Sequence, residues 1–192
     1  MKILLVVATE QEIIEDKFKD CTVLVTGVGM VNTAIHLTEE LLKNKYDVVL
    51  NMGVAGSFSE DFKIGDVVEV VEDNFSEIGF ENGSGFEGFS DFEIVTNYSV
   101  AGKTDLQKVR GITVNTVHGN EKSINEIVKR LNPDVESMEG AAVFKVCKKF
   151  AVTCMQIRAI SNKVEKRNKE NWDMHLAIKN LNDKVAQIIT DL

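Results

Sequence analysis

Two polar side chains stand next to apolar segments in the stretch 135–162. Glu139 follows the extended segment DVES and opens a helical segment with apolar periodicity, and Asn162 follows an apolar run that fits a buried strand. Strand, helix and strand in this order indicate a parallel α/β unit. Ligands bind outside the carboxyl ends of the strands in such sheets, so we expect both side chains to converge on one crevice.

A third polar candidate, Glu12, comes shortly after the continuous apolar run KILLVVA at residues 2–8. A run without polar alternation is typical of a strand that is buried on both faces, which places Glu12 near another strand end. In that position a ligand could reach the Glu12 carboxylate. The neighbouring acids Glu10, Glu15 and Asp16 fit a solvated acidic face better.

Simpler interpretations exist for Glu139 and Asn162. Glu139 could interact with the dipole of the helix that it opens, which contributes ~0.3–1 kcal/mol. Asn162 could be an ordinary turn residue. Taken singly, each residue favours the simpler interpretation. Their joint occurrence within the strings SMEGAAV and RAISN favours a functional role.

Those two strings resemble the purine nucleosidase and nucleoside phosphorylase superfamily. The resemblance spans nearly the whole chain and includes MKILLVVATEQEI, VTGVGMVNTA, NMGVAGSF and KIGDVV. VESMEGAA, RAISN and the downstream RNKENW are most similar to the futalosine hydrolases, nucleosidases of an alternative menaquinone pathway. The resemblance implies one α/β domain over residues 1–192, a three-layer α/β/α sandwich with a central mixed, mostly parallel sheet.

The same resemblance implies how a purine nucleoside would be cleaved. Glu12 matches the carboxylate that activates water, and Glu139 would hold the ribose hydroxyls opposite the developing positive charge. Asn162 would relieve the charge on the departing base. Further substrate contacts are expected from Val28, Val54, Gly119, Asn120, Ser137, Met138, Ser161 and Trp172. We expect no metal and no organic cofactor.

The amide of Asn162 bears on the identity of the base. Related methylthioadenosine nucleosidases carry Asp at this position. An amide donates to the O6 of a 6-oxopurine and accepts from a protonated N7, whereas an ionised Asp would face O6 with like polarity. A buried polar group left unpaired costs ~1–3 kcal/mol, which favours hypoxanthine over adenine. Because an amide is not an acid, we expect the N7 proton to come from water.

Two departures from related enzymes also bear on the reaction. Ser137 stands where the methylthioadenosine enzymes have Glu, which weakens the transfer of their sugar contacts to this chain. The glycine loop GVGMVN at residues 27–32 contains no Arg or Lys, which favours water over phosphate as the nucleophile. His118 lies in a loop that the resemblance places by the base, but a loop histidine is more often simply exposed.

Composition excludes several classes of protein. The net charge of −8 over 192 residues argues against nonspecific nucleic-acid binding. The three cysteines form no CxxC pair and indicate neither disulfides nor zinc, so we expect a reducing cytoplasm. No apolar run is long enough to span a membrane.

The segment at residues 73–93 differs from the rest of the chain because it mixes Gly, Ser and Asn with five phenylalanines. Exposed aromatic clusters usually mark a contact surface. We therefore expect either a subunit interface of a homodimer or a wall for an apolar substrate tail, and both can hold at once.

Three other functions stay open. They are a methylthioadenosine-type nucleosidase, a 6-oxopurine nucleoside phosphorylase, and a non-catalytic module that binds nucleosides. Glu12 argues against the last, because a pure binder does not need a carboxylate that activates water.

Overall fold

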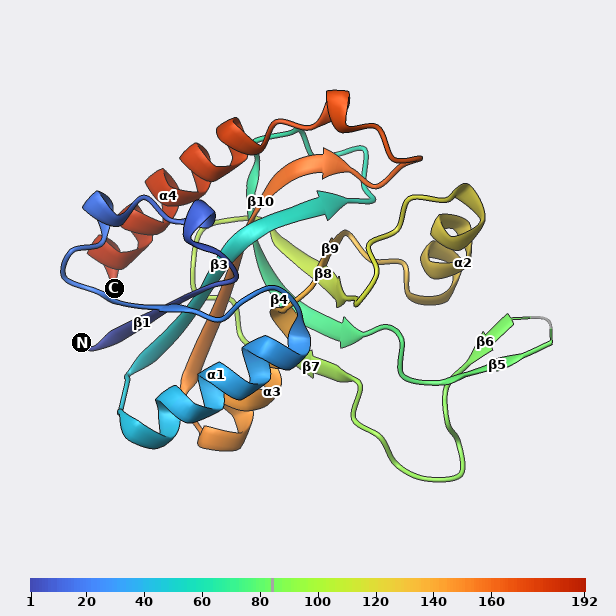
Figure 1. Cartoon of the computed structure of the whole chain (residues 1–192), viewed down its shortest axis with the longest axis horizontal. Helices are drawn as coiled ribbons and strands as arrows, with labels where there is room; N and C mark the ends of the chain where they lie inside the picture. Colours follow the sequence, from blue (N-terminus) through green and yellow to red (C-terminus); the bar gives the residue numbers. More distant parts are fainter. Residues whose placement is uncertain (84) are drawn as a thin grey trace.

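A mixed β-sheet forms the middle layer of the protein, with helices on both of its faces (Figure 1). The computed structural model describes residues 1–83 and 85–192. The strands of the sheet are β1 (Ile3–Val7), β2 (Thr22–Val25), β3 (Val48–Ser57), β4 (Val67–Phe75), β7 (Asn97–Ser99), β8 (Lys108–Thr113), β9 (Val135–Ser137) and β10 (Thr153–Lys163). The helices are α1 (Met30–Lys43), α2 (Glu121–Leu131), α3 (Gly140–Phe150) and α4 (Met174–Asp191). A separate hairpin consists of β5 (Phe80–Asn82) and β6 (Gly85–Glu87).

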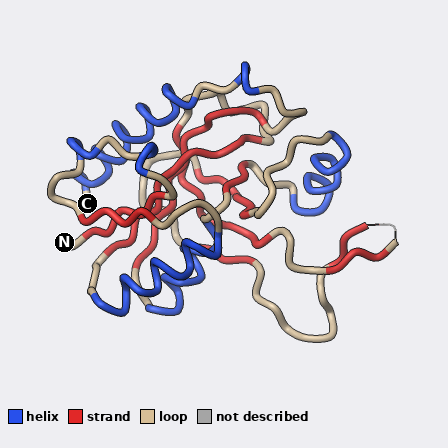
Figure 2. The backbone as a smooth tube through the Cα atoms, viewed as in Figure 1, coloured by secondary structure: helices blue, strands red, loops and turns tan. Residues whose placement is uncertain are grey.

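The apolar run at residues 2–8 forms a strand that is buried on both faces, as its sequence predicts. Leu5 of β1 belongs to the apolar cluster that contains Leu181 of α4. Leu4, on the opposite face, belongs to the cluster that contains Phe144 of α3. Helix α4 therefore covers one face of the sheet, and α1 and α3 cover the other (Figure 2). The predicted three-layer α/β/α sandwich is confirmed, and most strand pairs are parallel.

Five strands of the sheet pair with one another in a closed ring. Strand β3 pairs with β10, β10 with β4, β4 with β8, β8 with β9, and β9 with the end of β3. Strand β10 runs parallel to β3, whereas β9 runs antiparallel to it. The parallel α/β unit predicted for residues 135–162 is therefore wrong. The short strand β9 pairs with β3 at Gly56 and Ser57, so it lies beside the carboxyl end of β3.

Local sequence signals set the ends of several elements. Helix α2 ends at Leu131, and Asn132 adopts the left-handed conformation (φ 44°) directly before Pro133. Asn tolerates this conformation and proline cannot continue a helix, which accounts for the end of α2 at this point. Strand β4 begins two residues after Gly65, which has φ 91°, and continues to Phe75.

The phenylalanine-rich segment divides into a buried and an exposed part. Phe75 lies in the core beside Tyr98, and the ring of Phe86 lies 4.0 Å from the guanidinium of Arg130. Three others pack against one another and stay partly exposed: Phe80, Phe89 and Phe92. The β5–β6 hairpin projects from the body of the protein (Figure 1).

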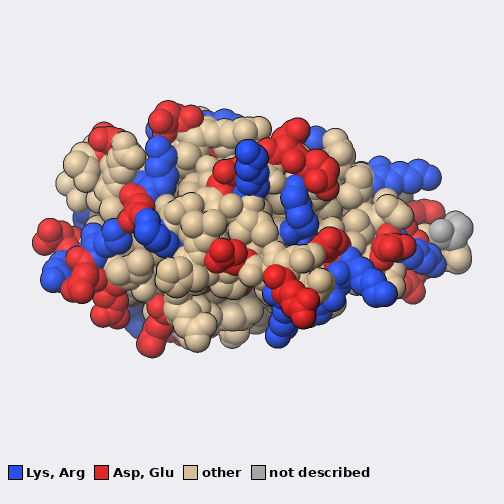
Figure 3. All heavy atoms as spheres, turned by 90° about the horizontal axis from the view of Figure 1, so that it is seen from above, with Lys and Arg blue, Asp and Glu red and all other residues tan. Residues whose placement is uncertain are grey.

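The charged side chains on the face drawn in Figure 3 alternate in sign, with Lys and Arg next to Asp and Glu over most of its area. A surface that binds nucleic acid nonspecifically gathers cations instead. Among the helices of residues 1–83 and 85–192, none has both the length and the apolar character that crossing a membrane requires.

Candidate active site

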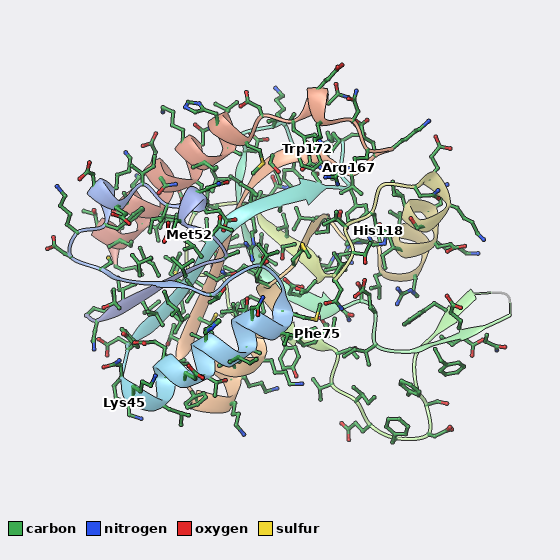
Figure 4. All side chains as sticks on the ribbon, in the orientation of Figure 1. Lys45, Met52, Phe75, His118, Arg167 and Trp172 are labelled. Atoms are coloured by element: carbon green, nitrogen blue, oxygen red, sulfur yellow. The ribbon has the colours of Figure 1, made fainter. Side chains whose placement is uncertain are left out.

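A cavity of about 320 Å³ opens where β1, β3, β9 and β10 end or cross. Figure 4 shows His118, Arg167 and Trp172 gathered near the carboxyl end of β3, and all three line this cavity. Most of the residues predicted for the site line it as well: Glu12, Val28, Val54, Ser137, Met138, Glu139, Ser161, Asn162 and Trp172. The expected convergence of Glu139 and Asn162 on one crevice is therefore what the structure shows, and Glu12 lies in the same cavity.

Glu12 ends a short 3-10 helix, Glu10–Glu12, that follows β1. Its Oε2 accepts hydrogen bonds from the backbone N–H groups of Ala8 (2.9 Å) and Thr9 (3.2 Å), and its Oε1 accepts one from Val54 (3.3 Å). The side chain is buried. Backbone donors from two strand ends thus hold the carboxylate in one position.

Glu139 occupies the N-cap position of α3, but its side chain does not cap that helix. Its Oε1 accepts a hydrogen bond from the backbone N–H of Gly29 (3.0 Å), in the loop before α1. Gly29 has φ 95°, a conformation that favours glycine, so the loop can present this N–H. The simple helix-dipole interpretation therefore does not account for Glu139, because the side chain reaches across to another loop.

Arg158 joins the two carboxylates, and the sequence analysis missed it. Its Nη2 lies 4.0 Å from Oε2 of Glu139 and donates to Oδ1 of Asn51 (2.6 Å). A Cβ on Gly53 would collide with Nη1 of Arg158 and would lie 2.8 Å from Oε1 of Glu12, so only glycine fits between them. A charged residue inside the apolar strand β10 is the signal that could have revealed this role.

Burial is the main influence on the titration of Glu12. Burial raises the pKa of Glu12, the positive charge of Arg158 lowers it, and the negative charge of Glu139 raises it. A carboxylate with a raised pKa is a stronger base, which suits a group that takes a proton from water.

Asn182 holds the segment that carries Glu12. This fully buried residue of α4 donates from Nδ2 to the backbone O of Glu12 (3.0 Å) and accepts at Oδ1 from the backbone N–H of Ile14 (2.7 Å). Both bonds are needed to satisfy the backbone groups of an irregular buried segment. The position of Glu12 thus depends on the docking of α4, which no local sequence pattern indicated.

The amide of Asn162 is fixed by its neighbours. Ser161 Oγ lies 2.9 Å from Oδ1 of Asn162 and is its hydrogen-bond donor, and Nδ2 of Asn162 donates to the backbone O of Lys163 (2.8 Å). The strand register shifts between Ile160 and Asn162, which places Ser161 in a bulge. One N–H and one lone pair of the amide stay available for a ligand.

Two residues predicted to contact substrate do not line the cavity. Asn120 instead caps α2, because its side chain accepts a hydrogen bond from the backbone N–H of Lys122 (2.9 Å). Gly119 lies beside Arg167. Their neighbour His118 lines the cavity and is half-buried, so the interpretation as a merely exposed loop histidine is wrong. An Asn directly before a helical segment is a strong N-cap signal. This signal could have shown that Asn120 caps a helix and does not line the site.

Ser137 offers a polar group to a ligand. Its buried Oγ has no hydrogen-bond partner among residues 1–83 and 85–192, and Ser137 lines the cavity. Such a group is normally satisfied, so a ligand hydroxyl is a suitable partner. The five phenylalanines of residues 73–93, in contrast, do not line the cavity of this chain. A wall formed by them is not observed, and the proposed subunit interface stays a prediction.

Comparison with known proteins places this arrangement in a family. The family described as "Phosphorylase superfamily" matches residues 7–192. The chain belongs to the phosphorylase superfamily.

Individual relatives of this superfamily are distant. The chain is 26% identical over 181 residues to a futalosine hydrolase of Thermus thermophilus, covering 88% of this chain and 80% of the relative. It is 29% identical over 189 residues to a 5'-methylthioadenosine/S-adenosylhomocysteine nucleosidase of a Geobacillus species, covering 90% and 82%. A crystal structure of such a nucleosidase from Neisseria meningitidis, in complex with methylthio-immucillin-A, superposes with a TM-score of 0.85 at 19% identity, covering 100% of this chain and 99% of the other. That likeness shows the fold.

A buried hydrogen-bond network connects strands β4, β8 and β10 with the first turn of α3. Asp73 of β4 accepts hydrogen bonds from Nε2 of Gln156 (3.0 Å) and Oγ1 of Thr113 (2.9 Å). Thr113 Oγ1 in turn accepts from the backbone N–H of Ala141 (2.8 Å), in the first turn of α3. A Cβ on Gly140 would collide with Asp73 and Gln156. The network therefore fixes the start of α3, where Glu139 lies.

The titration of Asp73 should make stability depend on pH. Burial raises the pKa of Asp73 from 3.8 to about 6, against the opposing effects of Gln156, Thr113 and Arg158. Between these values the folded protein binds more protons than the unfolded chain, so stability falls as pH rises and is constant above the folded pKa. A shift of about two pH units corresponds to about 3 kcal/mol.

We expect Asp73→Asn to remove this dependence. Urea unfolding of both proteins from about pH 4 to about pH 7 should show wild type losing about 2 kcal/mol relative to the variant. Asp191→Asn, at an exposed position, is the matched control for the loss of one carboxylate. A stability difference between wild type and Asp73→Asn that does not change with pH would contradict the assignment.

Proposed function

We propose that this protein hydrolyses the N-glycosidic bond of a purine nucleoside, and that the nucleoside is futalosine. The products are then hypoxanthine and dehypoxanthine futalosine, in menaquinone biosynthesis. The similarity to a futalosine hydrolase and to a methylthioadenosine/S-adenosylhomocysteine nucleosidase supports the nucleosidase activity. The cavity geometry supports it independently, because two buried carboxylates and an amide line one cavity and the buried Arg158 lies beside the carboxylates.

Each part of the cavity has a role in this reaction. Glu12 takes a proton from the attacking water, with its carboxylate held by backbone N–H groups and its pKa raised by burial. Glu139 accepts from the ribose hydroxyls and places negative charge near the oxocarbenium-like sugar. Arg158 keeps the two carboxylates close without strong repulsion. Ser137 and Trp172 contact the sugar side of the substrate.

The observation that carries the choice of futalosine is the amide of Asn162 in the cavity wall. Its remaining N–H can donate to the O6 of hypoxanthine. Adenine presents a donor at the same position, so the amide would have to turn, and the bonds from Ser161 and to Lys163 oppose that turn.

A methylthioadenosine-type nucleosidase is the second candidate, and the 29% identity to such an enzyme supports it. A 6-oxopurine nucleoside phosphorylase is less well supported, because the loop before α1 contributes only Val28 to the cavity. A non-catalytic binder would not need Glu12 as a buried base. We also propose that the protein is a cytoplasmic homodimer.

We expect cleavage without phosphate and without metal. The protein is incubated with futalosine, methylthioadenosine and inosine, each with and without phosphate and each with a chelator, and the released base and sugar are identified. Hypoxanthine from futalosine under all conditions is the expected result. Release of a sugar 1-phosphate, or inactivation by the chelator, would contradict it, and release of adenine alone would favour the second candidate.

A further inference from the structure

A second pair of titratable side chains lines the same cavity. The Nδ1 of His118 lies 2.7 Å from Oε2 of Glu136, and the backbone N–H of His118 donates to Oε1 of Glu136 (3.1 Å). The two side chains are 14% and 4% exposed. The other ring nitrogen, Nε2, has no hydrogen-bond partner among residues 1–83 and 85–192. Nothing in the mechanism given above uses this pair.

The pair lies next to Asn162 because of the strand pairing. Gly56 of β3 pairs with Glu136 of β9 on one side and with Asn162 of β10 on the other. A Cβ on Gly56 would lie 3.2 Å from Nδ2 of Asn162 and 3.6 Å from Cγ of Glu136. The same Cβ would lie 2.9 Å from Cγ2 of Val164, so the side chains of Val164, Asn162 and Glu136 crowd together beside Gly56. His118, bound to Glu136, therefore belongs to the wall that carries Asn162.

The carboxylate cluster lies further along the same strand. Gly53 contacts Glu12 and Arg158, and Gly56 contacts Asn162 and Glu136. Three residues along a strand span about 10 Å. Glu12, His118 and Glu136 all line the same cavity, so a ligand bound there can meet both the water-activating carboxylate and the His118–Glu136 pair.

The departing purine needs a proton that Asn162 cannot supply. As the glycosidic bond breaks, the bonding electrons move onto the base, and protonation of a ring nitrogen neutralises them. An amide is not an acid, whereas an imidazolium is the commonest proton donor near neutral pH. A carboxylate that accepts from Nδ1 fixes the orientation of the ring, which leaves Nε2 as the donor.

We propose that His118 is the general acid of the reaction, with Glu136 as its positioning residue; this rests on the proposed nucleosidase activity. The C1′–N9 bond breaks while the water oxygen bonds to C1′. The water proton goes to Glu12, and the Nε2 proton of His118 goes to a ring nitrogen of the base. Solvent then returns a proton to His118 and removes one from Glu12, so the net reaction is the addition of one water. This proposal differs from the expectation that water supplies the proton, and the test below decides between the two.

The electrostatic surroundings of His118 bear on a pH test. Glu136 of β9 faces the ring directly, and Phe58 lies edge-on to it at 6.0 Å. Three charged residues from the end of β10 and the segment after it line the same cavity: Lys163, Glu165 and Arg167. Lys163 is already bound to the backbone O of Ser59 and to Glu60, and Arg167 lies 5.0 Å from the ring of Trp172.

The test compares leaving groups that do and do not need a proton. His118→Gln keeps a side chain that can donate to Glu136 but removes the acid. It should lower kcat on futalosine by on the order of 10²–10⁴-fold. On 4-nitrophenyl β-D-ribofuranoside, whose nitrophenolate leaves without protonation, its kcat/KM should stay within a few-fold of wild type. Glu12→Gln should lower both.

A second readout is the pH dependence of kcat on futalosine. Wild type should lose activity on the alkaline side, and His118→Gln should not show that loss. Glu136→Gln should lower kcat on futalosine and leave kcat/KM on the nitrophenyl riboside within a few-fold of wild type, because it loosens the orientation of the acid.

Each outcome decides one of the proposals. Equal losses for His118→Gln on both substrates, or an unchanged rate on futalosine, would overturn the role of His118 while leaving the nucleosidase activity in place. An unchanged alkaline limb in His118→Gln would also overturn it. A wild-type protein that cleaves no purine nucleoside would overturn the proposed function itself and this inference with it.

Discussion

Glu12→Gln should leave a folded protein whose kcat is lower by on the order of 10²–10⁴-fold. The amide keeps the size of the side chain, and its oxygen can still accept from the backbone N–H groups of Ala8 and Thr9. What it loses is the ability to take a proton from water. Glu139→Gln should cause a loss of similar size, because a neutral amide no longer stabilises positive charge on the sugar.

The measurement is steady-state hydrolysis of futalosine with a thermal melt of each variant. Glu10→Gln is the matched control, since Glu10 lies two residues from Glu12, is exposed and does not line the cavity. It should retain wild-type turnover. Because burial raises the pKa of Glu12 above 4.5, wild-type activity should also fall on the acid side at a pH above that value. Near-wild-type turnover in Glu12→Gln or Glu139→Gln would remove that residue from the mechanism.

The fold was predictable because its elements carry strong periodic signals. The run at residues 2–8 has no polar alternation and is buried on both faces, and the helix before Pro133 ends where its sequence indicates. The direction of β9 was not predictable in the same way. A three-residue strand has no periodicity of its own, and its antiparallel pairing with Gly56 and Ser57 depends on how the whole sheet closes.

The site was predictable where chemistry and strand ends coincide, as for Glu12 and Glu139. It was not predictable where the contact joins distant segments. His118 and Glu136 are 18 residues apart, and the hydrogen bond of Asn182 to Glu12 spans 170. Arg158 carries a visible signal, a charge within an apolar strand, but its partners come from three other elements. The local sequence shows that a buried charge such as Arg158 needs a partner, but it does not show which residue is that partner.

Asn162→Asp should lower kcat/KM on futalosine selectively. The ionised carboxylate loses the donor to O6 and places negative charge beside it, which leaves a polar group of the site unpaired. The structure adds a local cost, since one carboxylate oxygen would face the backbone O of Lys163, to which Nδ2 now donates (2.8 Å). Loss of one such bond costs about 1 kcal/mol, so a small drop in melting temperature is expected with a much larger loss of activity.

Two comparisons separate base reading from turn structure. Asn162→Ala removes the same hydrogen bonds without adding charge, so it should lose activity on 6-oxo and 6-amino nucleosides alike. Asn162→Asp should instead shift the ratio of kcat/KM towards the 6-amino analogue of futalosine, whose amino group can donate to the carboxylate. Activity on futalosine should partly recover at low pH, where a protonated Asp can again donate. If Asn162 only shapes the bulge at Ser161, both variants will change the melting temperature and leave that ratio at its wild-type value.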